Sequence, residues 1–120
     1  MKYLLLVYHD EEMLQAMPED EYRALVEETL ANDERLRESG HFISSNVLEF
    51  VRSATTVRVR QGKLSVTDGP FAETKEQLGG YILIEAKDLD DAIKVAASLP
   101  PARIGSIEIR PLKDLAAGTR

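Results

Sequence analysis

The hydrophobic and polar positions of the chain follow two periods, one typical of strands and one typical of helices. Residues 2–8 form a continuous apolar run, which predicts a central strand buried on both faces. The acidic residues 10–12 end this run and predict a loop. Between Pro18 and Gly40, apolar residues recur at helical spacing, with proline at the start and glycine as a left-handed stop. The first part of the chain therefore predicts a strand followed by a long helix.

The middle of the chain predicts strands. Residues 41–51 indicate an irregular strand that Ser44–Asn46 interrupts. Residues 55–68 predict a β-hairpin, because Gln61–Gly62 is a two-residue connection with a glycine available for positive φ. With that turn the predicted cross-strand pairs place apolar residues on one face and like charges near the tip; they are Val59 with Leu64, Val57 with Val66, Arg58 with Ser65, and Arg60 with Lys63.

The last third of the chain predicts a strand, a helix and a strand. Residues 81–84 are apolar and predict another buried strand. Asp88, followed three residues later by Asp91, predicts the start of a helix that the double proline at 100–101 ends. Residues 106–110 alternate between apolar and polar, which is typical of a strand with one wet face or of one near an edge.

This order predicts an α+β fold, a ferredoxin-like βαββαβ sandwich with an inserted β-hairpin. At 120 residues the chain is expected to be one domain, residues 1–120. Two helices would cover one face of the sheet and leave the other face open. Because small domains commonly bury such a face by association, we expect a homodimer packed through the sheet face.

Composition and charge narrow the class of protein. Hydrophobic residues at 43% and charged residues at 30% are ordinary for a globular domain. The formal charge of −6 argues against nucleic acid and against an anionic membrane as partners, because both favour basic surfaces. No cysteine is present, which excludes a thiolate nucleophile and a disulfide framework. The first apolar run is too short to span a bilayer and lacks a cleavage signal, so we expect a cytoplasmic protein.

The densest group of reactive side chains lies in the loop after the hairpin. Asp68 starts a turn that Gly69-Pro70 bends, and Phe71 offers an apolar surface. The next residues add an acid, a hydroxyl and an amine: Glu73, Thr74 and Lys75. Such a loop could hold a small polar molecule against the strand ends, with Asp68 as the acid–base group. The same residue types are also ordinary turn chemistry and a solvated run.

His9 is the second candidate for acid–base catalysis. It ends the first strand beside Tyr8, where small α+β domains often open a pocket, and imidazole transfers protons near neutral pH. Tyr8 and Tyr81 are candidates for the substrate-binding surface, and Arg103 is a candidate anion clamp. An exposed histidine and a salt-bridged arginine are the simpler alternatives. The histidine spacing predicts no metal, and the glycines at 79–80 lack phosphate-loop spacing, so we expect no cofactor.

Asp33 lies on the apolar stripe of the long helix, where an unpaired carboxylate is costly. Two explanations are open. Either the side chain reaches water at the edge of the stripe, or the helix lines a cleft at that point.

Four segments resemble one known family in the same order. They are the opening MKYLLLVY, residues 67–80 (TDGPFAETKEQLGG), residues 88–92 and residues 105–111. On these motifs the chain resembles the YCII-related family, in its DGPF branch. The resemblance implies a ferredoxin-like dimeric α/β barrel. Some relatives occur fused to or encoded near sigma factors.

The resemblance also bears on chemistry. Better-studied YCII-type relatives carry a His and an Asp proposed as an acid–base pair, and one branch removes chloride from a chlorinated hydroxyquinol. The histidine of that pair lies on the first helix, where this chain has Thr29. Asp68 and the loop after it are what the DGPF branch offers in its place.

Two functions of different classes follow. The first is a cofactor-independent enzyme of lyase or isomerase type, acting on a small aromatic or oxygenated molecule. In it Asp68 or His9 is the acid–base group, Lys75 or Arg103 holds an anionic group, and Phe71 and Tyr81 form an apolar wall. The second is a non-catalytic dimeric module that senses a ligand or contacts a transcription-related partner.

Overall fold

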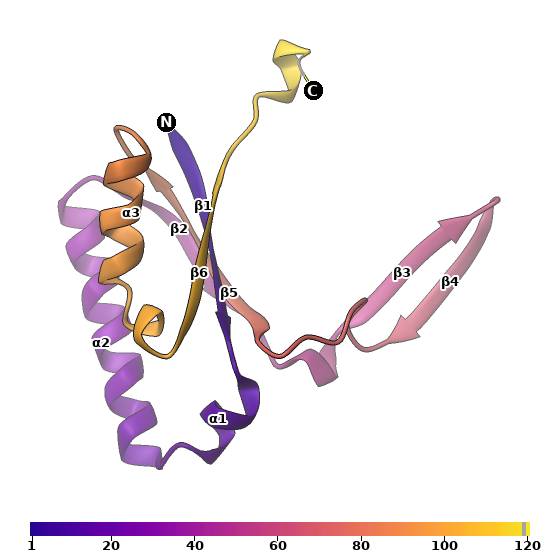
Figure 1. Cartoon of the computed structure of the whole chain (residues 1–120), viewed down its shortest axis with the longest axis horizontal. Coiled ribbons are helices and arrows are strands. Elements are labelled where there is room, and N and C mark those ends of the chain that lie inside the picture. The colour runs from indigo at the N-terminus through magenta and orange to yellow at the C-terminus, as the bar shows by residue number, and fades with distance from the viewer. Residues whose placement is uncertain (119) are drawn as a thin grey trace.

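The chain folds around a four-stranded antiparallel sheet with helices on one face, as seen in a computed structural model that describes residues 1–118 and 120 (Figure 1). The strand order is β2-β5-β1-β6. These strands are β1 (Lys2–His9), β2 (Phe42–Val47), β5 (Gln77–Glu85) and β6 (Gly105–Pro111). Helices α2 (Glu19–Glu38) and α3 (Leu89–Ser98) lie together on one side of the sheet (Figure 1). This confirms the predicted α+β, ferredoxin-like fold.

The core lies between this sheet and the two helices. Alternate residues of β1 are buried on the helix side, and Leu5 and Ile84 of neighbouring strands are fully buried. Helix α3 presents Ala92 and Ala96 to the sheet, and such small side chains let a helix approach closely. Asp88 caps this helix as predicted, since its carboxylate accepts the Asp91 N–H at 2.9 Å. The buried strands are as the sequence pattern predicted, whereas Tyr22, Val26 and Leu30 of the α2 stripe are exposed.

The opposite face of the sheet carries apolar side chains that the chain itself covers only in part. Leu4 and Leu6 of β1 and Leu83 of β5 point away from the helices, since strand side chains alternate, and all three are half-buried. The pattern predicted burial on both faces of β1, whereas a single chain buries only one. The expected packing of this open face on a second copy remains a prediction.

Two local features differ from the sequence-based expectations. The acidic residues after β1 do not form a loop but begin a short helix, α1 (Glu11–Ala16), whose first N–H groups are capped when Asp10 accepts the Glu12 N–H at 2.9 Å. Strand β2 is not interrupted at Ser44–Asn46. It runs on with a register shift near Phe42, because pairing with β5 satisfies its backbone.

The inserted hairpin forms a separate two-stranded sheet, which we call the arm, from β3 (Thr55–Arg60) and β4 (Lys63–Asp68). Its register matches all four predicted pairs. Gln61 and Gly62 both have positive φ, at 51° and 76°, as a two-residue turn requires. The arm projects from the sheet on the side opposite the helices (Figure 1).

Three short 3₁₀ helices complete the described structure: Val51–Ser53, Pro100–Arg103 and Leu115–Ala117. Among the residues described, no helix combines the length and the apolar character needed to cross a membrane.

Candidate functional site

A cleft of about 700 Å³ lies between α2 and the β2 side of the sheet. Its walls are mostly apolar. Helix α2 contributes Tyr22, Leu25, Val26 and Leu30, the β2 side contributes Val47, Leu48 and Phe50, and the floor includes Val7, Ile82, Leu99 and Pro100. A concave, largely apolar site of this size suits a small organic molecule.

His9 lies in this cleft at the end of β1. Its side chain is buried, with 9% exposed, and among the described residues its Nδ1 has no hydrogen-bond partner. The ring fits because the residue beside it is Gly79, where a methyl group would overlap the imidazole. A buried polar atom without a partner is uncommon, and this makes His9 a candidate for a functional role.

Asp33 reaches the same cleft from α2. It is 8% exposed; Ser45 of β2 donates a long hydrogen bond of 3.4 Å to its Oδ2, and its Oδ1 has no partner among the residues described. Burial raises the pKa of the Asp33 carboxyl, against the opposing effects of the Arg37 charge and the Ser45 hydroxyl. Of the two explanations open for this residue, the cleft-lining one is confirmed.

Further polar groups surround this pair. Thr29 lines the cleft one helical turn before Asp33, and its hydroxyl donates to the Leu25 carbonyl at 2.8 Å. Asn32, also in the lining, accepts a hydrogen bond from Arg35 at 3.2 Å. Arg52 is the single cationic side chain among the lining residues described. The cleft therefore favours a ligand with few negative charges.

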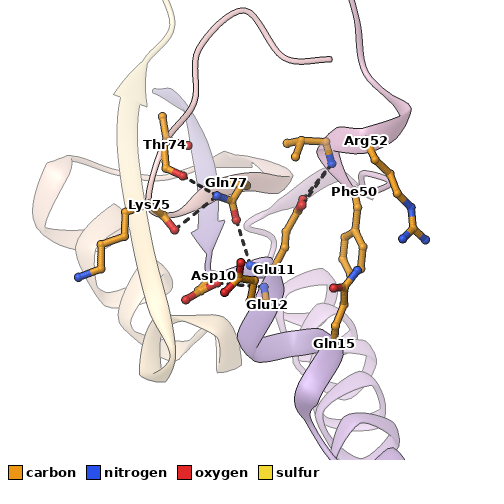
Figure 2. Close-up of a pocket in the computed structure, with 10 residues that line it drawn as sticks. Asp10, Glu11, Glu12, Gln15, Phe50, Arg52, Thr74, Lys75 and Gln77 are labelled. Atoms are coloured by element: carbon orange, nitrogen blue, oxygen red, sulfur yellow. Dashed lines mark hydrogen bonds between the residues drawn. The ribbon is translucent and has the colours of Figure 1, made fainter. Parts of the chain in front are cut away.

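A second, polar hollow of about 440 Å³ lies beside α1 (Figure 2). Its groups are largely paired with one another: the Glu11 carboxylate accepts the Val51 N–H at 3.1 Å, and Gln77 accepts the Glu11 N–H at 3.0 Å. Gln77 also donates to the Thr74 carbonyl at 2.6 Å. These bonds fasten the loop after the arm to α1. The hollow adjoins the cleft, because Phe50 and Arg52 line both.

The site residues predicted from the sequence lie in different parts of the structure. His9 and Tyr81 belong to the cleft lining, whereas Thr74 and Lys75 line the polar hollow. The Tyr81 hydroxyl accepts a hydrogen bond from Asn46 at 2.8 Å.

The remaining candidates lie outside both hollows. Asp68 ends β4 at the base of the arm, and Phe71 and Glu73 are exposed in the loop that follows. A single chain therefore does not bring Asp68 into the cleft that contains His9. Tyr8 is half-buried in β1, and burial together with Glu108 raises the pKa of its hydroxyl. Both terminal nitrogens of Arg103 donate to the Glu28 carboxylate, at 2.8 and 2.7 Å.

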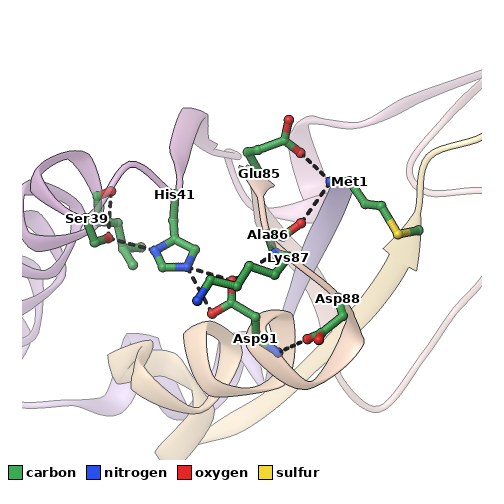
Figure 3. A network of polar contacts seen from close by, with 9 residues as sticks. Met1, Ser39, His41, Glu85, Ala86, Lys87, Asp88 and Asp91 are labelled. Carbon is green, nitrogen blue, oxygen red and sulfur yellow. Dashed lines mark hydrogen bonds and ion pairs between the residues drawn. The ribbon is translucent and has the colours of Figure 1, made fainter.

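A Ser-His-Asp cluster joins the end of α2 to α3 (Figure 3). The His41 Nδ1 lies 2.7 Å from the Ser39 hydroxyl, and its Nε2 lies 3.0 Å from Asp91. The Ser39 hydroxyl also donates to the Leu36 carbonyl at 3.1 Å, so it acts as a helix cap rather than a nucleophile. Asp91 further accepts the Lys87 N–H at 3.0 Å. We interpret the cluster as a structural connection that holds the end of α2 against α3. Across the residues described, no group of three or more His, Asp or Glu side chains is placed to hold a metal.

Comparison with known proteins identifies the family. The model of the YCII-related domain matches residues 1–116. The chain belongs to the YCII-related family. An uncharacterised protein of Rhizobium meliloti (strain 1021) is 38% identical to this YCII-related chain over 114 residues, which cover 93% of the chain and 92% of that protein.

A solved structure has a similar fold. It is the 5-chloro-2-hydroxyhydroquinone dehydrochlorinase of Burkholderia phenoliruptrix AC1100 in complex with 2,5-dihydroxybenzoquinone. The TM-score is 0.53 at 17% identity, with 94% of each chain covered. At this identity the likeness establishes that the YCII-related chain shares the fold.

Sequence reasoning missed part of the cleft. Asp33 carried a usable signal, since it is a carboxylate on an apolar helical stripe. Ser45 and Asn32 carried none, because serine and asparagine are common on any surface. Only the tertiary packing of β2 against α2 brings Ser45 within reach of Asp33.

Proposed function

We propose that this YCII-related protein is a cofactor-independent acid–base enzyme acting on a small, uncharged aromatic or oxygenated molecule bound in the cleft. One observation carries the proposal. Two buried polar atoms without partners among the described residues, His9 Nδ1 and Asp33 Oδ1, belong to residues that line the same apolar hollow. A carboxyl whose pKa is perturbed by burial in a cleft, as that of Asp33 is, is typical of functional sites.

The two side chains suit complementary roles. Imidazole can take and return a proton near neutral pH, so His9 is assigned as the base. Burial favours the protonated form of Asp33, so this carboxyl is suited to donate a hydrogen bond or a proton to a substrate oxygen. The apolar walls hold the ring and exclude water, which strengthens both interactions.

The position of Thr29 supports this choice of cleft. Thr29 stands where the family resemblance puts the histidine of the proposed acid–base pair, and Thr29 lines the cleft. His9 supplies an imidazole to the same cleft from β1 instead of from the helix. The ligand named for the structural neighbour, 2,5-dihydroxybenzoquinone, is an oxygenated ring and supports the proposed class of molecule.

The residues of the loop after the arm are assigned to substrate contacts and not to proton transfer. Thr74 and Lys75 line the hollow that adjoins the cleft through Phe50 and Arg52, so they are assigned to contacts with a larger substrate. Asp68 does not line the cleft of its own chain, so a catalytic role for it requires a second copy of the chain.

The test combines binding and turnover. The probes are 2,5-dihydroxybenzoquinone and 5-chloro-2-hydroxyhydroquinone, with related hydroxylated benzenes as a panel. We expect calorimetric binding to the wild type, and at least a tenfold loss of turnover of any accepted substrate for His9→Gln and for Asp33→Asn. Asp90→Asn, at an exposed acid of α3 outside the cleft lining, is the matched acid control and is expected to keep turnover. Full turnover by the double variant of His9 and Asp33 would refute the assignment.

One observation favours the alternative of a non-catalytic ligand-sensing or transcription-related module. Thr29 occupies the position of the family histidine, so the His–Asp pair proposed for the relatives is incomplete in this chain. The alternative predicts that a probe binds and raises the melting temperature while no member of the panel is converted. Specific association with a sigma factor in a pull-down, unaffected by His9→Gln, would support it over the enzyme.

A further inference from the structure

The arm exposes an apolar surface that its own chain does not cover. Val57, Val59, Leu64 and Val66 lie on one face of the hairpin, because each pairs with another member of the set, and they are between 58% and 69% exposed. A two-stranded hairpin is at best marginally stable alone in water. The Cα radius of gyration, 16.6 Å, exceeds the roughly 14 Å expected for a compact chain of this length. The arm thus has the features of a segment that packs on another molecule.

The charge of the arm points to its partner. Residues 55–68 contain three basic side chains, Arg58, Arg60 and Lys63, and one acidic side chain, Asp68, so the arm carries +2. The chain carries −6, so the rest of it carries −8. Helix α2 alone has eight acidic and three basic side chains, a net −5. The arm is therefore complementary in charge to another copy of its own chain.

The rim of the cleft offers a matching apolar surface. Tyr22, Val26 and Leu30 follow one another at four-residue spacing on α2, and all three are exposed at the mouth of the cleft. Val47, at the end of the edge strand β2, is 82% exposed across the mouth from them. These four residues define the rim: Tyr22, Val26 and Leu30 form an apolar strip on the acidic helix α2, and Val47 lies on β2.

The direction of the arm makes the contact reachable. Figure 1 shows the arm on the side of the sheet that faces away from α2 and α3, which is the side of the open face. A second copy packed on that face would lie alongside the arm. Six residues of strand extend about 20 Å, and packed sheets lie about 10 Å apart, so the arm passes the partner's sheet and reaches the level of its helices.

We propose that the arm of each chain docks on the cleft rim of a second copy, so that each protomer closes the mouth of the other's cleft. The occupant of the rim is the apolar face of the arm. Arg58, Arg60 and Lys63 lie on the other face of the arm, and from there their charge attracts the acidic helix α2 at longer range. Two-fold symmetry makes the exchange reciprocal. The proposal adds a lid to the site proposed above, but the docking itself is measured without any substrate.

The first test is disulfide trapping, which is clean because the chain has no cysteine. The variant Val59→Cys/Val47→Cys joins the arm to the rim, and on mild oxidation we expect a covalent dimer. The matched control Val59→Cys/Leu89→Cys replaces the rim residue by another exposed apolar position, on α3, and is expected to stay uncrosslinked. Equal crosslinking of both pairs, a disulfide within one chain, or no crosslink in the first pair would overturn the proposal.

The second test weakens the dimer. Val59→Lys/Leu64→Lys places charges on the apolar face of the arm, and we expect at least a tenfold higher dimer dissociation constant in sedimentation equilibrium. Ser65→Lys/Thr67→Lys adds the same two charges to the hairpin, on its opposite face, and is expected not to weaken dimerisation. Because both variants alter exposed positions, circular dichroism should show an intact fold. Unchanged dimerisation of Val59→Lys/Leu64→Lys would refute the docking. The proposed activity is tested separately: if the wild type shows no turnover but the Val59→Cys/Val47→Cys variant still crosslinks, only the proposed activity is refuted.

Discussion

Gly79 leaves the space that the imidazole ring of His9 occupies. The two residues lie on neighbouring strands, where the register shifts so that Val7 pairs with Gly80 and Tyr8 pairs with Leu78, and Gly79 is left unpaired in a bulge. A methyl group at Gly79 would overlap the His9 ring. Bulges often re-aim a side chain beside an active site, and this one accommodates the proposed base.

We expect Gly79→Ala to lower the free energy of unfolding by about 1–3 kcal/mol, the usual cost of overpacking a buried position. Chemical denaturation measures this cost. The control is a double-mutant cycle with His9→Ala, which removes the ring that the new methyl group would strike. In the His9→Ala background the cost of Gly79→Ala should shrink by more than half, and strict additivity would show that the ring is not the obstacle.

The raised pKa of Asp33 predicts that the free energy of unfolding falls as pH rises. Burial raises the pKa of its carboxyl in the folded chain above the ordinary value of 3.8. Between the unfolded and the folded pKa, the folded state binds more protons, so stability is fully present below 3.8 and falls as pH rises through the folded pKa. Asp33→Asn lacks this ionisation. We expect it to be more stable than the wild type at neutral pH, because the cost of burying an ionised carboxylate is removed.

The measurement for Asp33 is a series of urea denaturation curves from pH 3 to pH 8. The difference in stability between Asp33→Asn and the wild type should be small at the acid end and grow towards neutral pH. Asp20→Asn, an exposed acid in the first turn of the same helix, should show no such growth. A constant difference across the series would mean that burial does not perturb Asp33.

The fold was predictable because its main elements follow local rules. The apolar run of β1, the stripe of α2 and the Gln61–Gly62 turn each specify one local structure, and the hairpin register followed from the turn alone. Helix α1 was missed because six residues give too short a pattern. The continuity of β2 was missed because pairing with β5 overrides the turn preference of serine and asparagine.

The candidate site was less predictable, because it depends on which segments meet. The loop from Asp68 to Lys75 has the densest functional groups in the sequence, yet the structure divides it between the base of the arm and the polar hollow. Only His9 and Tyr81 of the nominated residues line the cleft. Composition can locate reactive groups along a chain, but the crossing of α2 over the sheet decides which of them share a cavity.

Asp91 predicts the opposite pH dependence to Asp33. The Lys87 N–H, and then the hydrogen bond to His41, lower the pKa of its carboxyl in the folded chain below 3.8. The stabilisation is therefore present above 3.8 and is lost as pH falls through the folded pKa. We expect Asp91→Asn to be less stable than the wild type at pH 6, with a difference that vanishes in acid. Asp90→Asn, beside it in the first turn of α3, is the control for the general effect of removing a carboxylate there.

Arg103, a candidate anion-binding residue, forms an ion pair with Glu28 in the structure. Both terminal guanidinium nitrogens donate to the one carboxylate, which lowers the pKa of Glu28 and raises that of Arg103. Both side chains are about half exposed, so solvent and salt weaken the pair. We therefore expect Arg103→Ala to lower stability much less than Gly79→Ala, and to leave calorimetric binding of an uncharged probe unchanged.

For an anionic probe, Arg103→Ala should also have no effect in the wild-type background, because Glu28 neutralises the guanidinium. Glu28→Gln frees that group, so in this background Arg103→Ala should weaken binding of the anion if the clamp lies within reach of the cleft. Weaker binding of the anion by Arg103→Ala in the wild-type background would show that the ion pair opens to admit a ligand.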